Sequence, residues 1–168
     1  MAKIEDRLPE NAPGDFFVDQ SCIDCETCAQ IAPEVFGRSA RALSFVKKQP
    51  ETEEQQIRAA MALVACPTSS IGNARKADTR AAVQRFPELI EDGVMYCGFT
   101  SESSFGASSY LVTRPSGNVL IDSPRAARPL AKRIAELGGA RLMFLTHRDD
   151  VADHAWYHAE LGCDRVIH

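Results

Sequence analysis

Four of the six cysteines have the spacing of ligands to an iron–sulfur cluster. Cys22, Cys25 and Cys28 follow one another at every third position, and the distant Cys66 is followed directly by Pro67. Three thiolates on a tight loop and one returning Cys-Pro pair suit a [4Fe–4S] cluster, because such clusters are held by cysteine sulfur. Zinc would also accept four thiolates, but its sites usually pair two C-x2-C segments rather than three cysteines plus one.

The remains of a second cluster motif indicate that one cluster is bound rather than two. The bacterial ferredoxin pattern is C-x2-C-x2-C-x3-C-P, whose fourth cysteine serves the other cluster. Ala32 stands where the first half-motif would have that cysteine, and Gln56, Ala59 and Ala62 stand where the second would have its triplet. The four remaining thiolates are enough for a single [4Fe–4S] cluster.

A second group of candidate ligands lies in a polar stretch directly after an apolar run. It contains His147, Asp149, Asp153 and His154. Imidazoles and carboxylates that converge at the end of a strand suit zinc, iron or manganese. These four residues therefore predict a second metal site, with iron or zinc as the metal.

The same side chains also have simpler interpretations. The acidic residues could cap a helix or face solvent, and His154 could form a surface pair with His158, four positions on. His168, at the end of the next predicted strand, is a further candidate ligand. The metal site and the solvated surface remain alternatives.

The composition favours a cytoplasmic protein that contacts neither membrane nor nucleic acid. The chain has 168 residues, a net charge of −4 and a hydrophobic fraction of 45%. It has no apolar run long enough for a transmembrane helix and no apolar signal-peptide segment at its N-terminus. Cysteines in cluster spacing indicate a reducing compartment rather than a disulfide framework. The remaining Cys97 and Cys163 are interpreted as small buried residues.

Negative charge is concentrated around the cysteine triplet. Residues 1–34 carry eight acidic and two basic side chains. Such a field repels nucleic acid and could steer a redox partner protein that has a basic docking face. The alternative is an acidic surface that serves only solubility.

The elements that must position the cysteines form a compact first domain. We expect a flexible leader over 1–14, a cluster domain over 15–72 and a linker over 73–92. The domain has strands at 16–19 and 42–46, one helical turn at 28–31, and a closing strand from Ile71. Thr52-Glu-Glu-Gln55 is a capping-box sequence and begins a helix that ends at Cys66. The expected order is β-α-β-β-α-β. A domain this small is marginally stable by itself, so we expect binding of the cluster to contribute to its folding free energy.

The remaining residues, 93–168, have the pattern of strands and helices expected of a layered α/β unit. Strands are expected at 95–99, 109–113, 119–122, 142–145 and 165–167. Helices are expected after Pro129, with Leu130, Ile134 and Leu137 on the buried face, and before Gly162. The apolar run 142–145 predicts a strand buried on both faces. The resulting order is β-β-β-α-β-α-β.

Residues 16–72 resemble the single-cluster [4Fe–4S] ferredoxins. The resemblance rests on the cysteine triplet and on four further segments: residues 17–19, Ala32-Pro33, Val35-Phe36 and Cys66-Pro67. It implies a ferredoxin-like fold and one-electron transfer, with Cys22, Cys25, Cys28 and Cys66 as the cluster ligands.

Residues 93–168 resemble the N-terminal portion of the metallo-β-lactamase fold. The resemblance rests on residues 104–111, on the strand ending at Asp122 and on residues 144–147. The family strand ends in T-H-x-H-x-D-H, and His147 matches its first histidine. Asp149 replaces the second, as a glutamate does in flavodiiron proteins, and Asp153-His154 match only after a two-residue insertion. The resemblance implies a partial αββα sandwich, so that the whole chain is α+β.

Two functions follow from these resemblances. The first is a [4Fe–4S] electron-transfer module fused to an incomplete metallo-β-lactamase-like domain. The second is a metal-dependent hydrolase or oxidoreductase in which the cluster is structural or regulatory. Because the family's second half with its further ligands does not follow, we expect an abbreviated form or a fragment. We therefore predict that these 168 residues alone are not a competent hydrolase.

Overall fold

The computed structural model describes residues 1–40 and 43–167 and divides into two compact units, Met1–Ala82 and Val83–His168. Ala42, the first residue of the predicted strand 42–46, and His168, a candidate ligand, both lie outside the described residues. Within the described part of the chain, no helix has the length and apolar character needed to span a bilayer.

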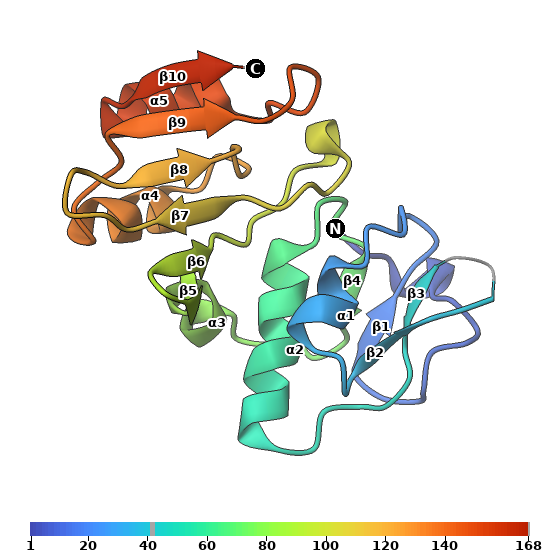
Figure 1. The fold of residues 1–168 in the computed structure, drawn as a ribbon. Helices are drawn as coiled ribbons and strands as arrows, with labels where there is room; N and C mark the ends of the chain where they lie inside the picture. Colours follow the sequence, from blue (N-terminus) through green and yellow to red (C-terminus); the bar gives the residue numbers. More distant parts are fainter. Residues whose placement is uncertain (41–42, 168) are drawn as a thin grey trace. The chain divides into compact units, whose positions relative to one another are not determined.

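The first unit follows the predicted order of strands and helices. After the 3-10 helix η1 (Ile4–Asp6), its elements are β1 (Phe16–Val18), α1 (Thr27–Ile31), β2 (Phe36–Arg38), β3 (Ser44–Val46), α2 (Glu53–Ala65) and β4 (Ile71–Asn73) (Figure 1). The strands form two separate antiparallel pairs, β1 with β4 and β2 with β3. Phe17 lies opposite Gly72, where any Cβ would come within 2.3 Å of the phenylalanine ring, so this position requires glycine.

Helix α2 begins with the predicted capping box. The Thr52 side chain accepts from the Gln55 N–H at 3.2 Å, and the Gln55 side chain accepts from the Thr52 N–H at 3.3 Å. Two N–H groups that have no partner within the helix are thereby satisfied. The helix ends where predicted, with Cys66 as its C-cap residue.

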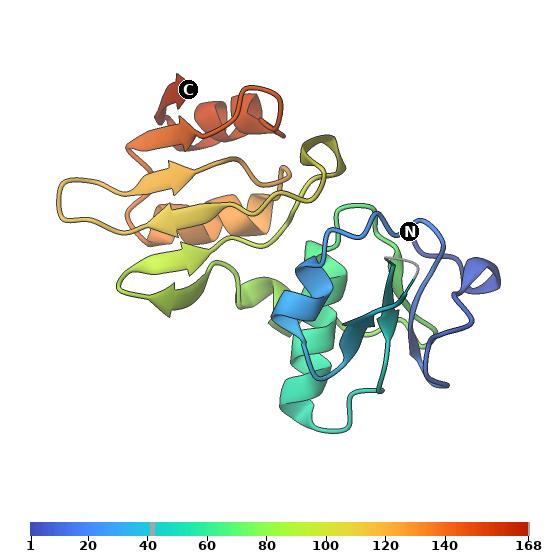
Figure 2. The ribbon, with the colours of Figure 1, turned by 45° about the vertical axis from the view of Figure 1, so that its right-hand side comes forward.

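Of the four positions where a second cluster would need cysteines, Gln56 is exposed and the other three carry buried alanines. Ala59 and Ala62 are fully buried on α2, and Ala32 is 3% exposed just after α1. Helix α1 packs against α2 in both views of the ribbon (Figures 1 and 2). Small side chains at these positions let the two helices approach closely, so the second cluster site has been replaced by a helix contact.

Residues 1–14, expected to be a flexible leader, are instead held against the first unit. The Asn11 side chain, 7% exposed, donates to the carbonyls of Leu8 and Val18 at 2.7 and 2.8 Å. Its Oδ1 accepts from the N–H groups of Val18 and Val46 at 3.0 and 2.9 Å. Asn11 therefore joins β1 to β3, which have no direct pairing. Pro9 and Pro13 prevent a helix here but do not prevent order.

The second unit is built on one six-stranded sheet. Its strands are β5 (Glu88–Glu91), β6 (Val94–Tyr96), β7 (Tyr110–Val112), β8 (Val119–Ile121), β9 (Leu142–Leu145) and β10 (Asp164–Ile167), in the spatial order β10-β9-β8-β7-β6-β5. β5 to β8 are antiparallel neighbours, and β8, β9 and β10 are parallel. The helices are α3 (Arg80–Gln84, which crosses the unit boundary), α4 (Arg128–Glu136) and α5 (His154–Leu161), with a 3-10 turn η2 (Glu102–Ser104).

Helices α4 and α5 connect the parallel strands and pack against each other on one face of the sheet (Figure 1). Leu111, Leu120 and Met143 are aligned across β7, β8 and β9 and are fully buried. Leu130 and Ile134 of α4 are fully buried as well. Burial on β9 alternates instead of being continuous, so the strand predicted to be buried on both faces is fully buried on one.

The segment 73–92, expected to be a linker, contains structure. It includes α3 and β5, and β5 pairs with β6 through Leu89 and Met95. The order in the second unit is therefore the predicted β-β-β-α-β-α-β with one additional strand at its start. Leu89 and Ile90 are about 60% exposed, and this edge strand lacks the hydrophobic alternation that would predict it.

Candidate iron–sulfur site

The cysteine triplet lies on a curled loop between β1 and α1. Asp24 and Glu26 have positive φ angles of 58° and 59°, a conformation that is uncommon outside glycine and that turns the chain sharply between the cysteines. Cys22 and Cys25 are partly exposed, whereas Cys28, on α1, is buried. Cys66 reaches the same place from the end of α2 and is also buried.

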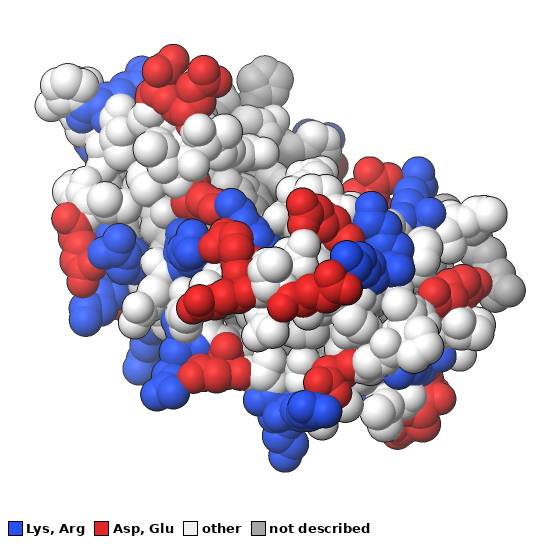
Figure 3. Space-filling model, turned by 90° about the horizontal axis from the view of Figure 1, so that it is seen from below, with Lys and Arg blue, Asp and Glu red and all other residues white. Residues whose placement is uncertain are grey.

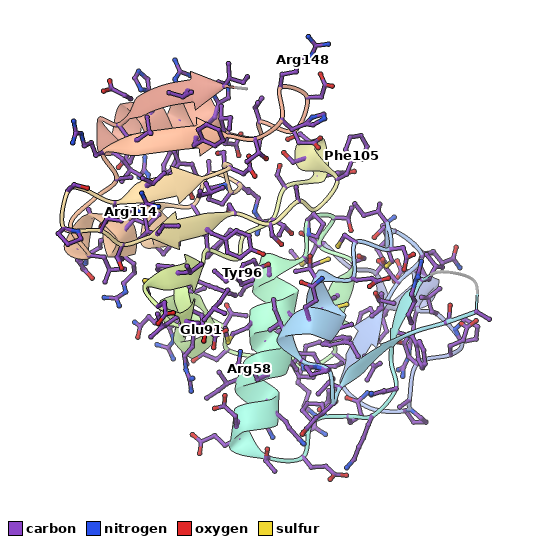
Figure 4. The ribbon with its side chains drawn as sticks, viewed as in Figure 1. Arg58, Glu91, Tyr96, Phe105, Arg114 and Arg148 are labelled. Atoms are coloured by element: carbon purple, nitrogen blue, oxygen red, sulfur yellow. The ribbon has the colours of Figure 1, made fainter. Side chains whose placement is uncertain are left out.

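All four predicted cysteines line one pocket. Apolar walls come from the ends of β1 and β4. The lining residues are Val18, Cys22, Ile23, Cys25, Thr27, Cys28, Ser44, Cys66, Thr68, Ser70 and Ile71. The loop and the distant Cys-Pro therefore meet as the sequence predicts. Figure 4 draws the side chains of this unit with sulfur in yellow.

The donor set of the pocket fits an iron–sulfur cluster. Four cysteine thiols from two separate segments line it, and iron–sulfur clusters are held by cysteine thiolates. In a [4Fe–4S] cluster each thiolate binds a different iron, so the four sulfurs surround a volume instead of a point. Within residues 1–40 and 43–167, no three His, Cys, Asp or Glu side chains are placed to share one ion.

Burial controls the ionisation of the thiol at the back of the pocket. Desolvation raises the pKa of Cys28 to about 12, although a hydrogen bond from the Ser44 side chain lowers it. The other three cysteines raise it further by charge repulsion. A free Cys28 is therefore a neutral thiol near pH 7, and binding iron there must release its proton.

Each sulfur has a polar group of the protein beside it. The Asp24 N–H donates to Cys22 Sγ at 3.5 Å. Thr27 Oγ1 lies 3.4 Å from Cys25 Sγ, and Ser70 Oγ lies 3.3 Å from Cys66 Sγ. Ser44 lines the same pocket, and its side chain lowers the pKa of Cys28.

These hydroxyl residues were not predicted from the sequence. Two sequence signals could have found some of them, since Thr27 follows Cys25 by two positions and Thr68 and Ser70 follow Cys66 by two and four. Ser44 has no such signal, because it reaches the pocket only through the folding of β3.

The acidic side chains in the cysteine loop are paired rather than free. Arg38 on β2 donates from Nε to Asp24 Oδ1 at 3.0 Å and forms an ion pair from Nη1 to Glu26 Oε1 at 3.1 Å. Residues 35–82 add eight basic and four acidic side chains to the unit. The negative field expected from residues 1–34 is therefore reduced by the rest of the fold.

The four residues of the predicted second metal site are not gathered around a single point. His147 lies near Asp149 and Asp150, with Nδ1–Oδ2 distances of 3.9 and 3.7 Å. Asp153 Oδ2, however, accepts from the Ala126 N–H at 2.6 Å. Among the described residues no metal-holding group of three includes any of them.

Arginine side chains lie beside two of the candidate ligands, His154 and Asp149. His154 Nδ1 lies 3.1 Å from an Arg165 guanidinium nitrogen, and desolvation together with that positive charge lowers the pKa of His154. Arg148, beside Asp149, is 81% exposed and points outward (Figure 4). A guanidinium in contact with His154 opposes the binding of a metal cation there.

Comparison with known families supports the first site. Residues 18–73 match the model of the 4Fe-4S single cluster domain of Ferredoxin I, a segment that contains all four cysteines. This match confirms the resemblance to single-cluster [4Fe–4S] ferredoxins that the sequence indicates. A comparison with curated proteins gave no match.

Similar solved structures are metallo-β-lactamases. A HARLDQ-motif mutant from Cronobacter sakazakii (Enterobacter sakazakii) is 28% identical, with a TM-score of 0.37, over 48% of this chain and 33% of that one. The C. sakazakii HARLDQ-motif protein gives 25% identity and a TM-score of 0.34, over 49% and 35%. The Rm3 metallo-β-lactamase gives 23% and 0.33, over 49% and 34%. The chain thus spans about a third of the length of these proteins.

Proposed function

We propose that the first unit binds one [4Fe–4S] cluster through Cys22, Cys25, Cys28 and Cys66 and that the chain transfers electrons. The observation that carries this proposal is the meeting of all four cysteines in one pocket, within a segment that matches the 4Fe-4S single cluster domain of Ferredoxin I. When bound, the cluster supplies one-electron oxidation and reduction.

The chain's own residues perform the remaining tasks. The four cysteines hold the cluster, and the positive-φ residues Asp24 and Glu26 set the curl of the loop. Val18 and Ile71 exclude water from the inner wall, where Cys28 and Cys66 are buried. Ile23, in the pocket lining and 41% exposed, marks the side of the loop that faces solvent. Electrons would enter and leave on that side.

A basic redox partner and a cytoplasmic location belong to the same proposal. Four cysteines in cluster spacing, rather than in a disulfide framework, support a reducing compartment. The proposed partner would dock a basic face against the acidic loop of this chain. Arg38 pairs with two carboxylates of that loop and so reduces the negative charge that would attract such a partner. The face drawn in Figure 3 carries acidic and basic side chains intermixed.

The test is to reconstitute the full chain anaerobically and measure iron and sulfide. The proposal predicts about four of each per chain, with visible absorption that dithionite bleaches and an EPR signal in the reduced state. Cys66→Ser should lose the cluster, whereas Cys163→Ser, outside the pocket, should keep it. A wild-type chain that takes up no cluster, or takes up only zinc, would refute the proposal.

A further inference from the structure

The pocket surrounds its sulfurs with side-chain hydroxyl groups. Three of the four sulfurs have a hydroxyl group beside them: Thr27 Oγ1 accepts from the Cys25 thiol, Ser70 Oγ lies 3.3 Å from Cys66 Sγ, and the Ser44 side chain lowers the pKa of Cys28. Once a sulfur is a thiolate it has no proton, so each hydroxyl must be the donor of its bond. The three donors come from α1, from β3 and from the loop after α2, so separate elements bring them to the pocket.

The three hydroxyl residues are buried, as are Cys28 and Cys66, whereas Cys25 is partly exposed. Thr27 is 4% exposed, Ser44 is 2% exposed and Ser70 is 1% exposed. Water cannot readily replace a donor that is lost at such positions. A hydrogen bond in this environment is electrostatically stronger than the same bond in water.

At Cys66 the hydroxyls form a short chain. Ser70 Oγ lies 3.3 Å from Cys66 Sγ and 2.8 Å from Thr68 Oγ1. When Ser70 donates to the thiolate, its oxygen is left to accept the Thr68 proton. Successive hydrogen bonds of this kind polarise and strengthen one another, which makes Ser70 the strongest of the three donors.

We propose that Thr27, Ser44 and Ser70 are positioning residues that raise the reduction potential of the cluster. This inference rests on the proposed cluster function. Reduction adds one electron, taken from an external one-electron donor, and therefore one negative charge to the cluster and its thiolates. A hydroxyl proton directed at a sulfur stabilises that added charge more than it stabilises the oxidised state, and hydrogen bonds to sulfur are among the known determinants of cluster potential.

The experiment measures the midpoint potential of the reconstituted full chain by dithionite titration under anaerobic conditions. Ser70→Ala is compared with Ser69→Ala, a matched deletion in the same loop whose side chain has no hydrogen bond within the described residues. Ser44→Ala and Thr27→Val repeat the test from β3 and α1. Iron and sulfide are counted in every variant, and the Fe–S(Cys) stretching band is recorded by resonance Raman.

We expect Ser70→Ala to have a more negative potential than wild type and an Fe–S(Cys) band at higher frequency, while Ser69→Ala keeps the wild-type values. Ser44→Ala and Thr27→Val should shift in the same direction by smaller amounts, and Ser70→Thr should restore the potential. The inference is overturned if every variant that binds a cluster keeps the wild-type potential. A wild-type chain without a reducible cluster would instead refute the proposed function, and this inference with it.

Discussion

Two cysteines of this chain, Cys28 and Cys97, are buried alike but differ in what surrounds them. Burial raises the pKa of each thiol to about 12. Cys28 shares its pocket with three further cysteines, so iron can compensate the charge of its thiolate. Cys97 is fully buried, and only the nearby Ser109 side chain and Leu111 backbone lower its pKa. It packs as a small apolar residue, as the sequence indicated.

This difference predicts a loss of stability at alkaline pH. The folded-state pKa of Cys97 is raised from 9.0 to about 12, so above pH 9 the unfolded chain releases a proton that the folded chain retains. The contribution to stability is full below pH 9 and declines as the pH rises towards 12. Burial also raises the pKa of Tyr157, which acts in the same direction.

The measurement is the melting temperature of the second unit from pH 7 to 11, followed by the fluorescence of Trp156, the one tryptophan of the chain. Cys97→Ala should decline less steeply than wild type above pH 9. At pH 7 residue 97 is neutral in both proteins, so the difference there reports packing alone. Parallel curves above pH 9 would show that the Cys97 thiol does not ionise on unfolding.

At the scale of elements, the first unit depends on amide side chains that form hydrogen bonds with the backbone N–H and C=O groups of its strands. Its strands form two separate pairs, and Asn11 connects β1 to β3 through three hydrogen bonds and makes a fourth to the Leu8 carbonyl. Gln49 supports the same strand, because its side chain accepts from the Phe16 N–H at 3.0 Å and donates to the Phe16 carbonyl at 2.8 Å. The side chains of Asn11 and Gln49 thus supply hydrogen bonds to β1 that pairing with a further strand would otherwise supply.

Asn11→Ala should therefore destabilise the first unit by at least about 2 kcal/mol, because it leaves buried N–H and C=O groups without partners. The change would be measured by denaturant unfolding of the reconstituted chain, followed through cluster absorbance. Asn73→Ala is the matched control, since its side chain accepts one exposed local bond from the Arg75 N–H. Equal unfolding midpoints for the two variants would contradict the structural role of Asn11.

The same elements show where prediction from sequence succeeds and where it does not. The capping box at Thr52 and the cysteine spacing depend on neighbours along the chain, and both were predictable. Asn11 was not, since its partners on β3 lie 35 positions away. The strand β5 and the hydroxyl of Ser44 were missed for the same reason: their roles come from tertiary pairing that leaves no local pattern.

For the molecule as a whole, two units with separate cores imply two separate stabilities. The first unit has short strands in pairs and one long helix. A domain with so little regular structure gains much of its folding free energy from the cluster that it binds. The second unit has a six-stranded sheet with a core of its own beneath α4 and α5. Removal of the cluster should therefore affect the first unit and spare the second.

We predict that Cys28→Ser, or iron removal by a chelator after oxidation, abolishes the cooperative unfolding of the first unit. Far-UV circular dichroism should lose the signal of α2, the longest helix among the described residues. The melting temperature reported by Trp156 on α5 should stay within a degree or two of the holo value, because the second unit has its own core. A ΔΔG of 1 kcal/mol shifts Tm by about 4–8 °C in a domain of this size, so a dependence of the second unit on the cluster would be detected. Melting temperature is the right readout, since a cluster can quench tryptophan intensity without any change in fold. A fall in the Trp156 transition on cluster loss would show that the second unit depends on the first, and the two would then have to be treated as one folding unit.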